Sequence, residues 1–67
     1  MKVYQRVYAC LGERGLKQKA VAAAARIPYA TFNAMMNGKR KIYVDELKAI
    51  CDALGVSADV MIGRETA

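Results

Sequence analysis

The sequence predicts an all-α fold, a small bundle of five short helices that forms one domain over residues 1–67. With 67 residues the chain can bury only a small core, which helices in local contact build at the least entropic cost. Apolar residues recur at the three- and four-residue spacing of a helical face, and no segment shows the alternation of a half-buried strand. The apolar fraction of 55% suffices for a packed core and argues against disorder.

The first two helices are expected over residues 2–13 and 17–25. Gly12 and Gly15 lie at the end of the first, where glycine commonly terminates a helix. The second is rich in alanine, the residue with the highest helix propensity. Each has one apolar face at helical spacing, which consists of Val3, Val7, Cys10 and Leu11 in the first helix and of Val21, Ala22 and Ala25 in the second.

The third helix is expected to begin at a tight corner, because Pro28 is disfavoured in helix interiors but suits a first helical turn. Pro28 also disfavours helical geometry at Ile27, the apolar residue of the corner. The helix would end at Met36 or Asn37, before Gly38. It has an apolar flank that faces the core, with Phe32, Met35 and Met36, and an exposed flank with Tyr29, Ala30, Asn33 and Asn37.

The last two helices are expected over residues 44–54 and 57–62. Gly55 follows the end of the fourth helix, whose apolar stripe consists of Leu47, Ile50, Cys51 and Leu54. Ser57 is a good N-cap for the short fifth helix. Residues 63–67 are expected to fray, since nothing in their sequence ties them down.

Charge is distributed unevenly along the chain. Residues 1–41 contain nine Lys and Arg and one acid, a net +8, whereas residues 42–67 contain two Lys and Arg and five acids, a net −3. The total of +5 is therefore concentrated in the part that includes the third helix and the basic run that follows it. A basic part joined to an acidic part indicates one surface that faces a polyanion and another that faces elsewhere.

The composition argues against several other classes of protein. There is no histidine and no cluster of acids in the basic part, so we expect no enzyme, no catalytic residue, no cofactor and no small-molecule substrate. Cys10 and Cys51 make a poor metal site without His or a Cys-x-x-Cys pair, and we expect both to be buried, reduced thiols. No apolar run is long enough for a membrane span or a secretion signal, which predicts a cytoplasmic protein.

The order of these features resembles the helix-turn-helix domain of the Cro/CI-type (XRE-type) phage repressors over about residues 3–62. The residues that carry the resemblance, none of them specific alone, are Gly15-Leu16, Gln18, Val21-Ala22, Ala25, Ile27, Phe32, Met35, Asn37-Gly38-Lys39-Arg40, Leu47, Ile50, Ala53-Leu54-Gly55-Val56-Ser57 and Asp59. The resemblance implies a lambda-repressor-like DNA-binding domain whose helix-turn-helix unit covers about residues 17–37.

The resemblance also implies which residues meet DNA. Base reading falls to the start of the second helix and to the third helix, namely to Gln18, Tyr29, Ala30, Thr31 and Asn33. The phosphate-holding loop of the family corresponds to Asn37, Lys39, Arg40 and Lys41, to which charge and position add Lys17 and Lys19. Asn33 is the best candidate for direct readout, because its amide can pair twice with adenine. The alternatives are an amide of Asn33 that is only solvated and a Tyr29 that packs against the corner.

Departures from the family pattern lead to further expectations. Arg26 stands where relatives often have Gly, which predicts a strained backbone or a different turn. Pro28 replaces the usual Ser or Thr cap. Leu11 and Met36 occupy the places where several relatives pair an Arg with a Glu. Because apolar residues often replace a partly buried ion pair without loss of stability, we expect Leu11 to touch Met36.

Together these observations predict a sequence-specific double-stranded DNA-binding transcriptional regulator. It would be a repressor from a phage, mobile element or bacterial operon that occupies an operator with the third helix in the major groove. A homodimer, formed in solution or only on DNA, would read two half-sites. The main alternative is a protein-binding regulatory module such as an antitoxin-like subunit, which would bind no duplex. An RNA-binding protein is the other alternative.

Overall fold

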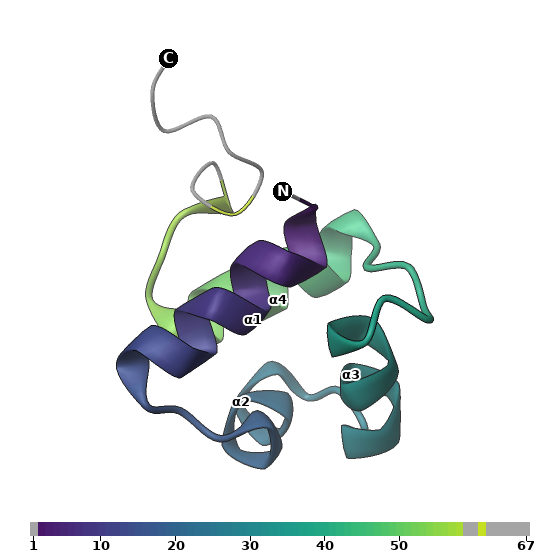
Figure 1. Ribbon diagram of the computed structural model, residues 1–67, viewed down its shortest axis with the longest axis horizontal. Coiled ribbons are helices and arrows are strands. Elements are labelled where there is room, and N and C mark those ends of the chain that lie inside the picture. Colours follow the sequence, from purple (N-terminus) through teal and green to yellow (C-terminus); the bar gives the residue numbers. More distant parts are fainter. Residues whose placement is uncertain (1, 59–60, 62–67) are drawn as a thin grey trace.

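The computed structural model describes residues 2–58 and Met61, and this part of the chain is helical, without strands. Figure 1 shows α1 (Val3–Arg14) lying across α4 (Val44–Leu54), with α2 (Gln18–Ala25) and α3 (Tyr29–Met36) next to each other below them. The predicted all-α class is confirmed. The described part contains four helices and not the five predicted; residues 59, 60 and 62 of the expected fifth helix lie outside it, as do residues 63–67.

The bounds predicted for α4 are confirmed, whereas α1, α2 and α3 each begin one residue later than expected. The reason is the same at all three starts. Lys2, Lys17 and Pro28 have extended backbones, with ψ of 159°, 144° and 139°, and each is the N-cap of the helix that follows. At its other end α1 continues to Arg14, one residue further than predicted, and stops at Gly15, whose φ is 65°.

Backbone hydrogen bonds close the corner between α2 and α3. The N–H of Arg26 donates to the carbonyl of Ala23 at 3.1 Å, and the N–H of Ile27 donates to the carbonyl of Ala22 at 2.9 Å. Ile27 is buried, as expected of the apolar residue of the corner. Arg26 has φ of 60° and ψ of 38°, the left-handed conformation that non-glycine residues rarely adopt. Arg26 therefore carries the backbone strain expected at this position.

The core lies between the helices, and its largest fully buried side chains are Phe32, Met35, Ile50, Met61 and Val7. Leu11 and Met36 are buried in the same cluster, and α1 packs on α3, but direct contact between the two side chains stays a prediction. Cys10 and Cys51 are buried and free, as expected. Burial raises the pKa of the Cys51 thiol, so this side chain stays protonated at neutral pH.

The end of α1 is tied to the end of α4. Nη1 of Arg14 donates to the carbonyl oxygen of Leu54 at 2.6 Å, across 40 residues of sequence. A guanidinium at this place satisfies one of the carbonyls that a helix leaves free at its C-terminus, and its charge suits the helix dipole. The stretch of chain between the two bonded residues contains α2 and α3.

Candidate nucleic-acid interface

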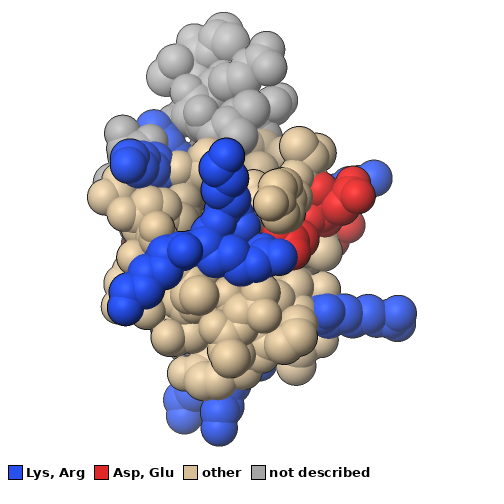
Figure 2. Space-filling view, turned by 90° about the vertical axis from the view of Figure 1, so that its right-hand side faces the viewer, with Lys and Arg blue, Asp and Glu red and all other residues tan. Residues whose placement is uncertain are grey.

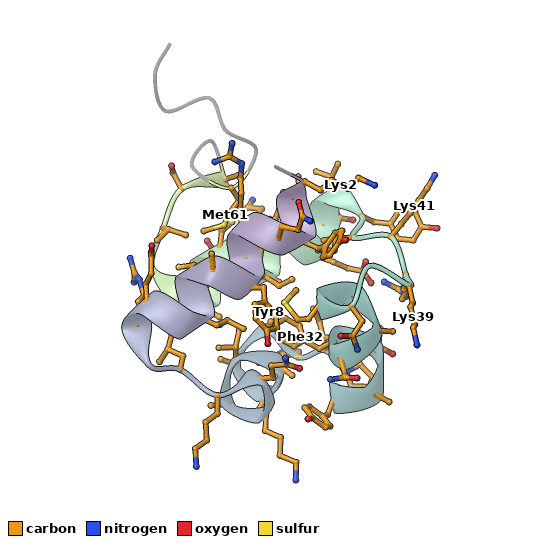
Figure 3. The ribbon with its side chains drawn as sticks, in the orientation of Figure 1. Lys2, Tyr8, Phe32, Lys39, Lys41 and Met61 are labelled. Atoms are coloured by element: carbon orange, nitrogen blue, oxygen red, sulfur yellow. The ribbon has the colours of Figure 1, made fainter. Side chains whose placement is uncertain are left out.

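The two flanks of α3 differ in exposure as the sequence predicts. Phe32, which Figure 3 labels on the inner side of α3, is fully buried together with Met35. The opposite flank, called the outer flank below, consists of Tyr29, Ala30, Asn33 and Asn37. Asn33 is half-buried and the other three side chains of the outer flank are exposed. One side of α3 therefore holds the helix in the core while the other stays accessible to a partner.

Three side-chain amides form a chain of hydrogen bonds along the outer flank. Nδ2 of Asn33 donates to Oε1 of Gln18, the first residue of α2, at 3.0 Å. Nδ2 of Asn37 donates to Oδ1 of Asn33 at 3.1 Å, one helical turn apart. The chain joins the start of α2 to the end of α3, and it brings together Gln18 and Asn33, which the sequence predicts as separate base readers.

The other predicted base readers have different surroundings. Nζ of Lys19 lies 5.6 Å from the centroid of the Tyr29 ring, within the range of a cation–π interaction. Tyr29 is 46% exposed, so part of this side chain is accessible to a partner, and its packing against the corner stays an alternative. Ala30 is exposed. Thr31 is half-buried and lines a depression with Glu46 on the side of α3 that faces α4, apart from the amide chain.

Exposed lysines border the outer flank in two groups. Lys17 and Lys19 stand on either side of Gln18 at the start of α2. Lys39 and Lys41 lie in the loop after α3, and Figure 3 shows them on the α3 side of the molecule. The sequence predicts phosphate contacts for all four, and all four ammonium groups lie where a long polyanion could reach them. Their contact with phosphate stays a prediction.

Arg40 differs from its lysine neighbours because the protein itself binds its guanidinium. Nη1 of Arg40 donates to Oε1 of Glu46 at 2.8 Å and to the carbonyl of Lys41 at 3.0 Å. Figure 2 shows acidic atoms directly beside the cationic cluster on this side of the molecule. The hydrogen bond from Arg40, and then that from the backbone N–H of Tyr43, lower the pKa of Glu46. Arg40 is thus less free to reach a phosphate than the sequence suggests.

The structure adds one cation that the sequence did not single out. Lys2, just before α1, lines a depression together with Tyr4, Lys39 and Lys41. The depression forms because the start of α1 packs against the loop after α3: a Cβ on Gly38 would lie only 2.7 Å from Cζ of Tyr4. The sequence does not show which loop lies next to Lys2, so only the packing of the two segments reveals this neighbour.

Three features typical of other kinds of site are absent from the described part of the chain. Among residues 2–58 and 61, no group of three or more His, Cys, Asp or Glu could hold a metal ion. No helix of this part is long and apolar enough to cross a membrane. No buried side-chain nitrogen or oxygen of these residues lacks a hydrogen-bond partner, so no orphaned polar atom marks a buried ligand site there.

Comparison with known proteins adds an independent finding. A sequence profile of the Cro/C1-type HTH DNA-binding domain matches residues 9–61. The match contains the whole of α2, α3 and α4, with the corner and the loop after α3, and thus every predicted base-reading and phosphate-binding residue. The comparison with curated proteins found no match, and neither did the comparison with solved structures.

Proposed function

Because the chain belongs to the Cro/C1-type helix-turn-helix DNA-binding family, we propose that it is a sequence-specific transcriptional regulator, a repressor that occupies a double-stranded operator. In this proposal α3 lies in the major groove with its outer flank toward the base edges. Bound there, the protein blocks access of RNA polymerase to the promoter. Such a regulator acts in the bacterial cytoplasm, on the operator of a phage, a mobile element or a host operon.

The observation that carries the proposal is the position of the outer flank between exposed cations. The apolar flank of α3 is buried, so the helix presents one side only. Lys17 and Lys19 stand at the start of α2, and Lys39 and Lys41 follow the end of α3. The major groove of B-DNA is about 12 Å wide and admits one helix between two rows of phosphates. An exposed helix flank bordered by the lysines at the start of α2 and by those in the loop after α3 suits that geometry.

In this proposal the four lysines neutralise phosphates. Arg40 contributes mainly by bracing the loop through its ion pair with Glu46. Each neutralised phosphate steepens the dependence of log affinity on log salt by about 0.9, so four lysines correspond to a slope of about −3.6. Phosphate contacts set the register of the protein on the duplex, while the outer flank supplies sequence preference.

A homodimer would read two half-sites about one helical turn apart. We place the partner face on the start of α4 and the residue before it, where Tyr43 is 61% exposed and Val44 is 83% exposed. Exposed apolar side chains of this size favour burial against another protein surface. Asp45 and Glu46 follow directly, and Glu46 is paired with Arg40, whose guanidinium also lies 5.6 Å from the Tyr43 ring centroid. In this proposal the partner that covers Tyr43 and Val44 is a second copy of the chain.

The proposal is tested by selecting bound sites from a pool of random duplexes at about 50 mM salt, where phosphate contacts are strongest. The expected result is a motif with two-fold symmetry. Lys39→Ala should weaken binding to all duplexes by a similar factor, because a phosphate contact carries no base information. Lys48→Ala, which removes an exposed lysine from α4, is the matched control and should weaken binding far less.

Three outcomes would contradict parts of this proposal. A protein that binds no duplex at low salt would be a protein-binding module, the antitoxin-like alternative. A protein that exchanges its duplex for RNA in a competition experiment would be an RNA-binding protein. A change in the selected motif on Lys39→Ala would make this lysine a base reader and would remove it from the phosphate contacts.

A further inference from the structure

We propose that Gln18 and Asn37 are positioning residues that hold the amide plane of Asn33, so that this side chain selects adenine at one position of each half-site. The inference rests on the proposed function and deepens it. It assigns a joint role to residues that the sequence predicts to act separately, with Gln18 as a base reader and Asn37 as a phosphate ligand. The two side-chain hydrogen bonds of Asn33 carry it.

The hydrogen-bonding capacity of the Asn33 amide is only partly used within the protein. A side-chain amide offers two N–H donors and an oxygen with two lone pairs. Asn33 gives one donor to Gln18 and takes one hydrogen bond from Asn37. One N–H and one lone pair are left, and adenine presents the complementary pair in the major groove, an acceptor at N7 and a donor at N6. The same count holds if the chain of amide bonds runs in the opposite direction.

The second step concerns the freedom of the Asn33 side chain. Its partners come from two different elements, Gln18 from the start of α2 and Asn37 from the C-cap of α3. The bond to Gln18 is partly buried, which shields it from competing water. An amide held on both sides has lost rotational freedom before DNA arrives. Binding therefore costs less conformational entropy, and fewer pairings with bases other than adenine are tolerated.

The third step concerns access to the free edge of Asn33. Ala30 precedes Asn33 by three residues on the outer flank and is exposed, so the neighbour of Asn33 at that position contributes only a methyl group. Tyr29, four residues before Asn33, lies beside the ammonium group of Lys19 at 5.6 Å from its ring centroid. A base edge can therefore approach Asn33 over Ala30.

The test is duplex selection and affinity measurement with wild type, Asn33→Ala, Gln18→Ala, Asn37→Ala and the double variant Gln18→Ala/Asn33→Ala. Wild type should prefer adenine at one position by about 5- to 150-fold, the range of a good bidentate contact. Asn33→Ala should abolish this preference. Gln18→Ala and Asn37→Ala should each reduce it at the same position, and the double variant should be no less selective than Asn33→Ala alone. Lys17→Ala, the neighbour of Gln18, is the control and should weaken all duplexes alike.

The free protein provides a second measurement. The order parameter of the Asn33 side-chain NH2 group, measured by 15N relaxation, should fall in Gln18→Ala while the melting temperature of the domain changes little. An unchanged order parameter would overturn the positioning role of Gln18 whatever the DNA data show. This readout separates a positioned amide from a merely folded helix.

The outcomes distinguish the inference from the proposed function. If Gln18→Ala weakens every duplex by the same factor and keeps the adenine preference, Gln18 is a phosphate ligand and the inference is wrong. If it changes preference at a different position, Gln18 reads a base on its own and the inference is again wrong. If wild type binds no duplex, the proposed function fails and the inference fails with it.

Discussion

A residue with left-handed backbone stands near each end of α3, and the two residues differ in how closely other atoms pack around them. Before the helix Arg26 has φ of 60°, and after it Gly38 has φ of 74°. Arg26 is exposed, whereas a Cβ on Gly38 would lie 2.7 Å from Cζ and 2.8 Å from Oη of Tyr4. The left-handed conformation costs a non-glycine residue about 1–2 kcal/mol. The turn before α3, at Arg26, therefore bears only the conformational cost. At the turn after α3 a residue other than glycine at position 38 would add a steric clash with Tyr4.

Phe32 anchors α3, the helix between the two turns, in the core. Loss of this side chain should lower the free energy of unfolding more than any other change considered. Phe32 is fully buried, so Phe32→Ala should lower the free energy of unfolding by about 3–5 kcal/mol. Tyr29→Ala is the matched control, since it removes a similar ring that is 46% exposed. Urea denaturation followed by circular dichroism measures both. Equal losses in the two variants would show that the core does not anchor α3 through Phe32.

Gly38→Ala tests how tightly Tyr4 packs against the turn that follows α3. The new methyl group would meet the Tyr4 ring in addition to the left-handed backbone, and we expect a loss of about 2–3 kcal/mol. Gly15→Ala is the matched control, because Gly15 also has a positive φ, 65°, but no heavy atom lies within 4 Å of the place that its new methyl group would occupy. It should lose only about 1–2 kcal/mol. If Gly38→Ala loses no more than Gly15→Ala, Tyr4 does not constrain the turn after α3.

Arg26→Gly tests the turn before α3 and should stabilise the domain. The change removes the strain of a left-handed residue that has a Cβ. Glycine loses more conformational entropy on folding, so the net gain in the free energy of unfolding should be about 1 kcal/mol. For a domain of this size such a gain raises the melting temperature by about 4–8 °C. Arg26→Ala keeps the strain and removes only the long side chain, so its melting temperature should not rise. A rise in both variants would mean that the arginine side chain, and not its backbone, is unfavourable.

The smallest effect expected is the pH dependence of stability that comes from the ion pair between Arg40 and Glu46. Arg40 and the Tyr43 N–H lower the pKa of Glu46 in the folded state. The stabilisation that Glu46 provides is therefore complete above the pKa of a free glutamate, about 4.3, and is lost as the pH falls through the lower folded value. The fall in melting temperature between pH 7 and pH 3 should be slightly smaller in Glu46→Gln than in wild type. An identical fall would show that the ion pair adds nothing to stability.

Most of the fold could be predicted because its signals are local. The apolar stripe that ends at Gly55 predicts α4 with its observed bounds, and Pro28 marks the corner between α2 and α3. The sequence places three helix starts one residue early, because an extended N-cap such as Lys17 looks like a first helical residue in the sequence. The two flanks of α3 are also predictable, since they follow from helical periodicity alone.

The chemistry of the candidate site was less predictable because it depends on contacts between elements. The spacing of Asn33 and Asn37 is visible in the sequence, but the bond from Asn33 to Gln18 requires the packing of α2 against α3. The pairing of Arg40 with Glu46 crosses a loop whose path no periodicity describes. The three side chains of the basic run therefore differ in the structure: Arg40 is paired with Glu46, whereas Lys39 and Lys41 are exposed.

The bond between Arg14 and Leu54 bears on how the domain meets DNA. It links the ends of α1 and α4, and the two helices proposed to read DNA lie between the bonded residues in the chain, with α2 packed on α4 and on α3 and with α3 packed on α1. We expect the domain to dock as a rigid body, with a small heat-capacity change of binding in calorimetry that reflects the interface alone. Association of such a rigid domain with duplex DNA would be limited by diffusion and orientation, without a folding step in the described helices.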